Sequence, residues 1–207
     1  MLLHKKIVFF LGLFLCAVTP VQAATMDSLI ELLSFKQYSA DFQQKTMDQK
    51  ESLLQQLEGV ITFEKPNKFY WQSQEPFPQE LVGNGKLIWH FDADLEQVLV
   101  QDYSKQVDTT PMLLLLQNTA ALKENFSLLQ SKVEGNQQFF SLQMHDKQSN
   151  VERIDIGFTD KKLSYLLFVD QLKQTTSIRF SNIQLDQPVA ADKFEFVIPE
   201  DADVLYE

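Results

Sequence analysis

The segment "LVGNGKLIWHFDADLEQV", residues 81–98, carries the clearest fold signal in the chain. Asn84-Gly85 is a strong short signal for a β-hairpin, because both turn positions need positive φ angles. It predicts strands near 79–83 and 86–92. "DAD" at 92–94 predicts a second tight return, because aspartate side chains bond locally to turn backbone. The segment therefore predicts consecutive antiparallel strands.

Alternating apolar residues continue on both sides of this segment. In "RIDIGF", Ile154, Ile156 and Phe158 share one face, and polar side chains fill the other. Such a sheet must curl or cover its apolar face. The sequence therefore predicts a mainly β (α+β) domain: a strongly curved antiparallel sheet covered by two short helical segments. The ten strands expected lie near 60–66, 68–73, 79–83, 86–92, 95–101, 125–133, 137–144, 152–158, 163–169 and 175–183.

The last of these strands changes its apolar phase. Ile178 and Phe180 share one face, but Ile183 and Leu185 continue the apolar pattern one position out of step. An extra residue in a strand produces such a change, so we expect a β-bulge after Phe180.

Two segments have helical signals. Thr25–Lys36 begins with cap candidates, and Ser28-x-x-Glu31 matches a capping box. The leucines of this segment, Leu29, Leu32 and Leu33, fall on one helical face.

The second helical segment is "TTPMLLLLQNT", residues 109–119. Thr110 is a natural N-cap, and Pro111 suits the first helical position, where a missing N–H costs nothing. Met112–Gln117 is expected to form a short apolar helix, and Asn118-Thr119 to cap a further turn through Lys123.

The N-terminus has the three parts of a secretory signal peptide. His4-Lys5-Lys6 is basic, Ile7–Val18 is apolar, and Val21-Gln22-Ala23 is a small-x-small cleavage site. We therefore expect residues 1–23 to be removed and residues 24–207 to form a single domain.

Cys16 raises the alternative of a bacterial lipoprotein signal. Such a signal needs a small residue before its cysteine, where this chain has Leu15. Cys16 is the one cysteine of the chain, so we expect it to leave with the signal. Disulfides and thiol catalysis are then excluded from the mature chain.

The charge balance narrows the class of partner. Loss of Lys5 and Lys6 with the signal takes the formal charge from −10 to −12. This charge argues against nucleic acid as a partner and against adsorption to anionic lipid surfaces.

The motifs of common enzyme classes are missing. The chain has no Gly-x-Ser-x-Gly elbow, His-x-x-x-His pair, phosphate loop or dinucleotide fingerprint. His90 with Asp92 and Asp94 is a conceivable catalytic or metal cluster. Its aspartates occupy an expected hairpin turn, and "DADLE" lacks the glycine and ligand spacing of a calcium loop. We expect no enzyme activity, no metal and no cofactor.

Several stretches together resemble one family. From Tyr38 onward the chain has "YSADFQQK", "LEGVITFEKPNKFYWQSQEP", "LVGNGKLIWHFDADLEQV", "DTTPMLLLL" and "FEFVIPEDADV". In this order and spacing they resemble the periplasmic lipoprotein carriers of Gram-negative bacteria, the LolA family.

The resemblance implies an open antiparallel half-barrel whose short helices form a lid over an apolar cavity. It also implies a function in the periplasm: a monomeric carrier accepts acylated lipoproteins from an inner-membrane ABC transporter and delivers them to an outer-membrane lipoprotein receptor. No bond is made or broken, and no cofactor is used.

The resemblance assigns roles to five residues. Lys65 stands where the family usually has an arginine that holds the lid closed, and Phe69 matches an aromatic residue near the cavity mouth. Met112 and Leu115 lie on the expected lid, and Leu32 is its expected packing partner. The competing interpretations are a solvated charge for Lys65, plain core for Phe69 and an ordinary buried helix for the leucine run.

Three rival functions remain open at this point. A lipid-anchored receptor of the same architecture would need the lipoprotein signal that Leu15-Cys16 does not provide. A periplasmic sensor of the same architecture would be expected to carry a second domain. An exported lipid-processing hydrolase would need a nucleophile and a base, and the sequence offers no recognisable pair.

Overall fold

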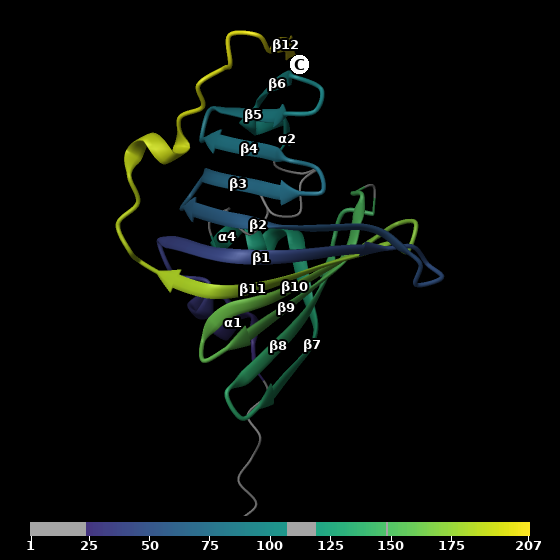
Figure 1. Cartoon of the computed structure of the whole chain (residues 1–207). Coiled ribbons are helices and arrows are strands. Elements are labelled where there is room, and N and C mark those ends of the chain that lie inside the picture. Colours follow the sequence, from purple (N-terminus) through teal and green to yellow (C-terminus); the bar gives the residue numbers. More distant parts are fainter. Residues whose placement is uncertain (1–23, 107–118, 148) are drawn as a thin grey trace, which may run out of the picture.

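A computed structural model describes residues 24–106, 119–147 and 149–207. In these residues twelve strands form one sheet, in the order β12-β6-β5-β4-β3-β2-β1-β11-β10-β9-β8-β7 (Figure 1). Neighbouring strands are antiparallel except β12, Asp203–Tyr206, which runs parallel to β6, Gln97–Asp102. The sheet is open, because β12 and β7, Phe126–Glu134, lie at its two ends.

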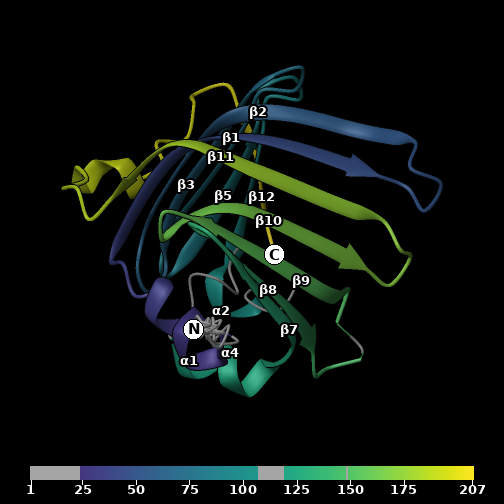
Figure 2. The ribbon, with the colours of Figure 1, turned by 90° about the horizontal axis from the view of Figure 1, so that it is seen from below.

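The sheet is strongly curved, and its described α-helices lie on one side of it (Figure 2). These helices are α1, Met26–Leu32, α2, Tyr103–Gln106, and α4, Thr119–Asn125. The expected curved, helix-covered antiparallel sheet is therefore confirmed. The remaining strands are β1 Gln37–Met47, β2 Leu53–Glu64, β3 Lys68–Glu75, β4 Gln79–Asn84, β5 Leu87–Asp92, β8 Gln137–Met144, β9 Val151–Thr159, β10 Lys162–Asp170 and β11 Thr175–Leu185.

The hairpin predicted at Asn84-Gly85 is present and joins β4 to β5. β4 and β5 meet at Asn84 and Gly85; Gly85 has a φ of 92°, but Asn84 does not have the positive φ that was expected at both turn positions. The Asn84 Oδ1 atom accepts hydrogen bonds from the backbone N–H groups of Lys86 and Leu87, both at 3.0 Å. Asn84 stabilises this turn through its side-chain hydrogen bonds, and Gly85 supplies the positive φ angle. Both effects are local, so the dipeptide alone was enough to predict the hairpin.

The expectation of ten strands is wrong by two. β1 lies at the centre of the sheet between β2 and β11, but only its first half alternates, through Tyr38, Ala40 and Phe42. Its second half is polar and reads as a loop. β12 is short and lies at an edge, where a strand needs little apolar character.

The first helix is also shorter than expected. α1 ends at Leu32 rather than Lys36, because Leu33 is its C-cap and the chain enters β1 at Gln37. Its capping box joins Thr25 and Ser28 instead of Ser28 and Glu31, with Thr25 N to Ser28 Oγ at 2.8 Å and Ser28 N to Thr25 Oγ1 at 3.2 Å. The predicted helix over Met112–Gln117 lies outside the described residues.

The expected bulge after Phe180 is confirmed. Ser39 pairs with Gln184, but Asp41 pairs with Ser181, so β11 has one residue more than β1 between these pairs. Asn182 has a φ of 52° within this stretch. The bulge bends the central strands and contributes to the curvature.

Each face of the sheet has its own apolar cluster. The larger one contains Leu29 and Leu33 at α1 and Leu122 of α4, so it occupies the face that the helices cover. On the other face Phe194, in the short 3-10 helix η1, Ala191–Phe194, packs on Tyr70 and Val82. No helix in the described part of the chain combines the length and apolar composition of a membrane span.

Candidate functional site

Lys65 links the β2–β3 turn to the end of α1. Its backbone N–H donates to the Lys36 carbonyl at 2.8 Å. Its Nζ donates to the backbone carbonyl of Leu33, the C-cap of α1. The same Nζ lies 4.8 Å from the centroid of the Phe35 ring. The Lys65 side chain therefore binds the C-cap carbonyl of the first helix.

The environment of this ammonium group is unusual for a lysine. Its partners in the described residues are a carbonyl and an aromatic face, and no ion pair to Lys65 is formed among them. Burial lowers the pKa of Lys65 from 10.5 to about 8, because a buried charge loses its hydration. The charge at this position is therefore sensitive to mildly alkaline pH.

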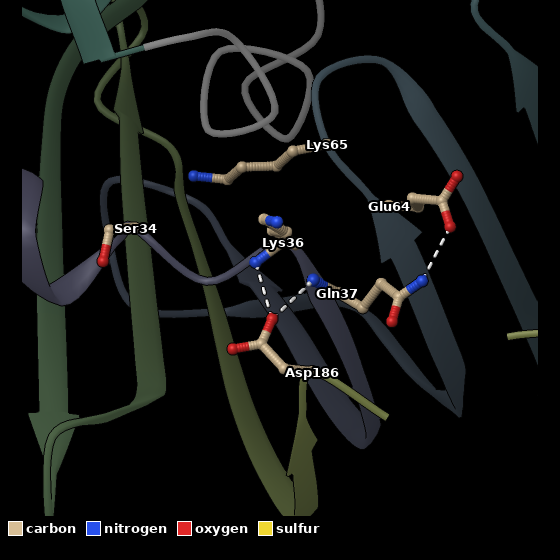
Figure 3. A pocket seen from close by; sticks show the side chains of 6 residues that line it. All are labelled: Ser34, Lys36, Gln37, Glu64, Lys65 and Asp186. Atoms are coloured by element: carbon tan, nitrogen blue, oxygen red, sulfur yellow. Dashed lines mark hydrogen bonds between the residues drawn. The ribbon is translucent and has the colours of Figure 1, made fainter. Parts of the chain in front are cut away.

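A polar groove of about 740 Å³ surrounds Lys65, and Figure 3 shows the side chains that line it. The Asp186 Oδ1 atom accepts hydrogen bonds from the backbone N–H groups of Lys36, at 2.7 Å, and Gln37, at 3.1 Å. The Gln37 Nε2 atom donates to Glu64 at 2.8 Å, and this bond, with a second from Lys68, lowers the pKa of Glu64. These bonds fix the chain between α1 and β1 at the end of the sheet.

An aromatic layer lies next to this polar groove. Tyr38 and Phe63 are stacked with ring centroids 4.8 Å apart, and Phe35 lies within 5.6 Å of both. The Tyr38 hydroxyl donates to the Leu163 carbonyl at 2.7 Å, and burial raises the pKa of Tyr38. The Tyr38 hydroxyl thus links β1 to β10, which lie on either side of β11, through a hydrogen bond inside an apolar cluster.

Phe69 lies in the same apolar cluster, on β3, and only 2% of its surface is exposed. Its ring lies against β4 at Gly83, where an added Cβ atom would come within 2.2 Å of a ring carbon. Gly83 was not among the residues predicted for the site. Its signal was a glycine inside a strand, which often marks a close approach of another group.

The structure brings three of the five predicted site residues to one cluster. Phe69 is part of it, Leu32 packs against it half-buried, and Lys65 contacts its Phe35 ring. Met112 and Leu115 lie outside the described residues. The roles assigned to all five residues remain predictions.

In the alternative cluster around His90, Asp92 holds the turn that follows β5. The Asp92 Oδ1 atom accepts hydrogen bonds from the backbone N–H groups of Asp94 and Leu95, both at 3.1 Å, which is the turn role expected of it. Burial lowers the pKa of His90. No group of three potential metal ligands occurs in residues 24–106, 119–147 and 149–207.

One serine–histidine pair escaped the sequence argument. The Ser127 Oγ atom lies 2.7 Å from His145 Nε2, and His145 Nδ1 lies 2.8 Å from the Glu124 carbonyl oxygen. Because that carbonyl can only accept, Nδ1 carries a hydrogen, and in the neutral imidazole the hydroxyl of Ser127 then donates to Nε2. The pair ties α4 to β7 and to the end of β8. It lacks the carboxylate that orients the histidine in a hydrolase triad.

Comparisons with known proteins address the family directly. Residues 34–197 match the family model "Outer membrane lipoprotein carrier protein LolA". The chain belongs to the LolA family. An outer-membrane lipoprotein carrier protein of Chromohalobacter salexigens is 34% identical over 185 residues, covering 89% of this chain and 87% of the relative. One of Nitrosospira multiformis is 31% identical over an alignment of 209 residues that covers 100% of this chain and 100% of the relative.

A solved structure supports the same fold. An uncharacterised conserved protein of Thermus thermophilus aligns with a TM-score of 0.55 and 11% identity, covering 88% of this chain and 97% of that one. At this identity the likeness concerns the fold alone. LolA-family membership confirms the resemblance on which the site was predicted, and the role of Lys65 as a latch remains a prediction.

Proposed function

We propose that this chain is a periplasmic carrier that shields the acyl chains of lipoproteins in transit. It takes them from an inner-membrane ABC transporter and delivers them to an outer-membrane receptor. The observation that carries the proposal is the continuous apolar cluster on the helix-covered face of an open sheet, in a member of the LolA family. An acyl chain needs such a surface, and a sheet without closure can admit it from one side.

The free energy of burying an acyl chain favours a mechanism in which the cargo displaces side chains of the protein. Burial of an acyl chain contributes about 0.8 kcal/mol per CH₂. A permanently open apolar cavity would bind such a chain too tightly and would promote aggregation when empty. If apolar side chains of the protein fill the site when cargo is absent, the net affinity is the difference between two burials. A receptor then needs only a somewhat better site to receive the cargo.

Lys65 is proposed to set how firmly the α1 end is held on the sheet. It donates one bond to the Leu33 carbonyl, whereas an arginine offers a planar fork that can bind two acceptors. A single ammonium bond is easier to break. We therefore propose that this carrier opens for cargo with a weaker latch than an arginine would give.

The carrier is proposed to act as a monomer without a catalytic step or cofactor. Residues 1–23 are proposed to be its export signal, so the exported chain should begin at Ala24 and carry no lipid. An N-terminal mass with a diacylated Cys16 would instead indicate an anchored receptor.

Depletion tests the function most directly. Loss of the protein in its host should leave outer-membrane lipoproteins in the inner membrane, as measured by membrane fractionation. In a purified system, the exported protein should release a labelled lipoprotein from transporter-containing vesicles and deliver it to receptor-containing vesicles. Normal sorting after depletion, with no release in the purified system, would refute the proposal.

A further inference from the structure

β1 and β3 flank β2 in the sheet, but β3 pairs with a shorter part of β2 than β1 does. β1 pairs with β2 from Leu53 to Glu64, with Leu54 as one extra residue between the pairs Met47–Leu53 and Thr46–Gln55. β3 pairs with β2 only from Glu58 onward, where Glu58 opposes Glu75. In the described part of the chain, the stretch Leu53–Leu57 therefore has a strand on one side and none on the other. Figure 1 shows β2 running on past the end of β3.

A bulge ends the pairing of β3 with β2 at this point. Glu58 pairs with Glu75 and Gly59 with Ser73, so Gln74 is an extra residue on β3. Bulges of this kind terminate a ladder. The chain then turns away through Pro76 and Phe77 before β4 begins. The Ser73 hydroxyl holds this turn by donating to the Phe77 carbonyl at 2.8 Å.

The result is a groove of about 770 Å³, which we name the rim notch. Its lining residues are Leu53, Leu54, Gln55, Gln56, Glu58, Gln74, Pro76 and Phe77.

The rim notch combines unpaired backbone hydrogen-bonding groups with exposed apolar side chains. Alternate residues of a strand direct their backbone N–H and C=O groups to each side, so the free edge of Leu53–Leu57 offers both donors and acceptors. Around it, Leu54 is 53% exposed and Phe77 is 50% exposed. Leu53 is 56% exposed, and Leu54 is an extra residue in the pairing of β2 with β1, so the regular alternation of the strand is interrupted here. A strand added here would place side chains beside these exposed apolar neighbours.

We propose that the rim notch binds an extended segment of a partner polypeptide, which adds as a short strand to the free edge of β2. Five residues of edge correspond to about 17 Å of partner backbone. The glutamines of the lining suit a polar backbone better than hydrocarbon, and the notch is recessed between strand and turn, which disfavours a bilayer. Glu58 is the one charged side chain among the described lining residues, so neutral and basic segments are preferred.

This inference does not depend on lipoprotein carriage. The notch lies at the β1–β2 turn end of β2, whereas Lys65 follows the other end of that strand. Failure of cargo transfer would leave it standing, and failure of peptide binding would leave the carrier proposal standing.

The test uses the exported protein and a panel of soluble peptides of about nine residues, the length that spans the edge with short flanks. In the sequence of each peptide, Val, Leu or Thr alternates with Lys or Gln. Each peptide has a control twin of the same sequence in which alternate backbone amides are N-methylated. Binding should slow hydrogen exchange at the outward amides of Leu53–Leu57 by at least about tenfold, and the N-methylated twins should not bind. Leu54→Lys with Phe77→Ser should weaken binding by at least about tenfold. Leu172→Lys, at a still more exposed leucine in the β10–β11 turn, should change it less than about twofold.

Four outcomes would overturn the proposal. One is the absence of binding by any peptide at about 1 mM, and another is equal binding by the N-methylated twins. The third is protection of the same amides by phosphatidylethanolamine–phosphatidylglycerol vesicles without peptide, which would assign the notch to a membrane. The fourth is protection that rises with protein concentration alone, which would assign it to a second copy of the chain.

Discussion

The Lys65 ammonium group donates a hydrogen bond to the backbone carbonyl of Leu33, thirty-two residues earlier in the chain. The bond joins the turn between two central strands to the cap of the first helix. A helix C-cap leaves carbonyls without intrahelical partners, so a cation there is favourable, but this one is buried. Lys65 therefore combines a structural contact with a cost of desolvation.

This cost predicts a specific pH dependence of stability. The pKa of Lys65 is about 8 in the folded protein against 10.5 unperturbed, so between these values the unfolded chain binds more protons. The free energy of unfolding should therefore rise with pH across this window, by on the order of 1–3 kcal/mol relative to Lys65→Leu. Urea unfolding of both proteins from about pH 7 to about pH 11 measures the difference. A difference that stays constant with pH would mean that Lys65 is solvated.

The same substitution tests the latch. Lys65→Leu removes the bond to Leu33, so the α1 end should loosen and expose apolar surface. Binding of a hydrophobic dye to the free protein should rise, and cargo should be taken up but delivered poorly. Lys68→Leu is the matched control, because Lys68 begins β3 and pairs with Glu64 at 3.0 Å on a more exposed side. If both variants bind dye and transfer cargo like the parent, the bond from Lys65 to Leu33 does not act as a latch.

Gly83 and Phe69 should be energetically coupled. Gly83→Ala places a methyl group within 2.2 Å of the Phe69 ring, so it should destabilise the protein by about 1–3 kcal/mol. Phe69→Leu vacates part of that space, so Gly83→Ala should cost clearly less in its presence. A double-mutant cycle from denaturant unfolding gives the coupling energy. Additive effects would show that the ring moves aside without cost.

The pair Ser127 and His145 is expected to be structural. Its hydroxyl and imidazole have the spacing of a nucleophile and base, but a backbone carbonyl stands in place of the carboxylate. Hydrolysis of p-nitrophenyl esters should be the same for the parent and Ser127→Ala. Ser127→Ala should instead lower stability by about 1 kcal/mol, through the lost hydrogen bond. Esterase activity that disappears with Ser127 would favour the hydrolase alternative.

How much of the molecule the sequence predicted depended on whether the signal was local. The turn at Asn84-Gly85 and the alternation in 152–158 depend on neighbouring residues, and both led to the observed strands. The polar half of β1 is stabilised by pairing with β2 and β11, which no local pattern records.

Prediction of the site residues was limited in the same way, because their contacts are non-local. Lys65 and Phe69 came from a resemblance rather than from periodicity, because the contacts of Lys65 with Leu33 and Phe35 join segments distant in the chain. Ser127 and His145 meet across two strands, and Gly83 is explained only by the ring above it. Non-local contacts of this kind become visible only when the register of the sheet is known.

Phe69→Glu gives the sharpest test of the apolar site. Loss of the ring removes roughly 2 kcal/mol of apolar contact, and an ionised carboxylate against hydrocarbon costs several more unless water reaches it. If the cluster opens to admit cargo, the charge can hydrate through the same opening. The variant should then fold but fail to extract lipoprotein from donor vesicles, and it should inhibit the parent protein if it still occupies the donor. Circular dichroism and a transfer assay on one sample separate folding from function, and Phe139→Glu, at a phenylalanine that is 38% exposed on β8, controls for added charge. An unfolded Phe69→Glu would make Phe69 sealed core, and a folded variant with normal transfer would remove it from the site.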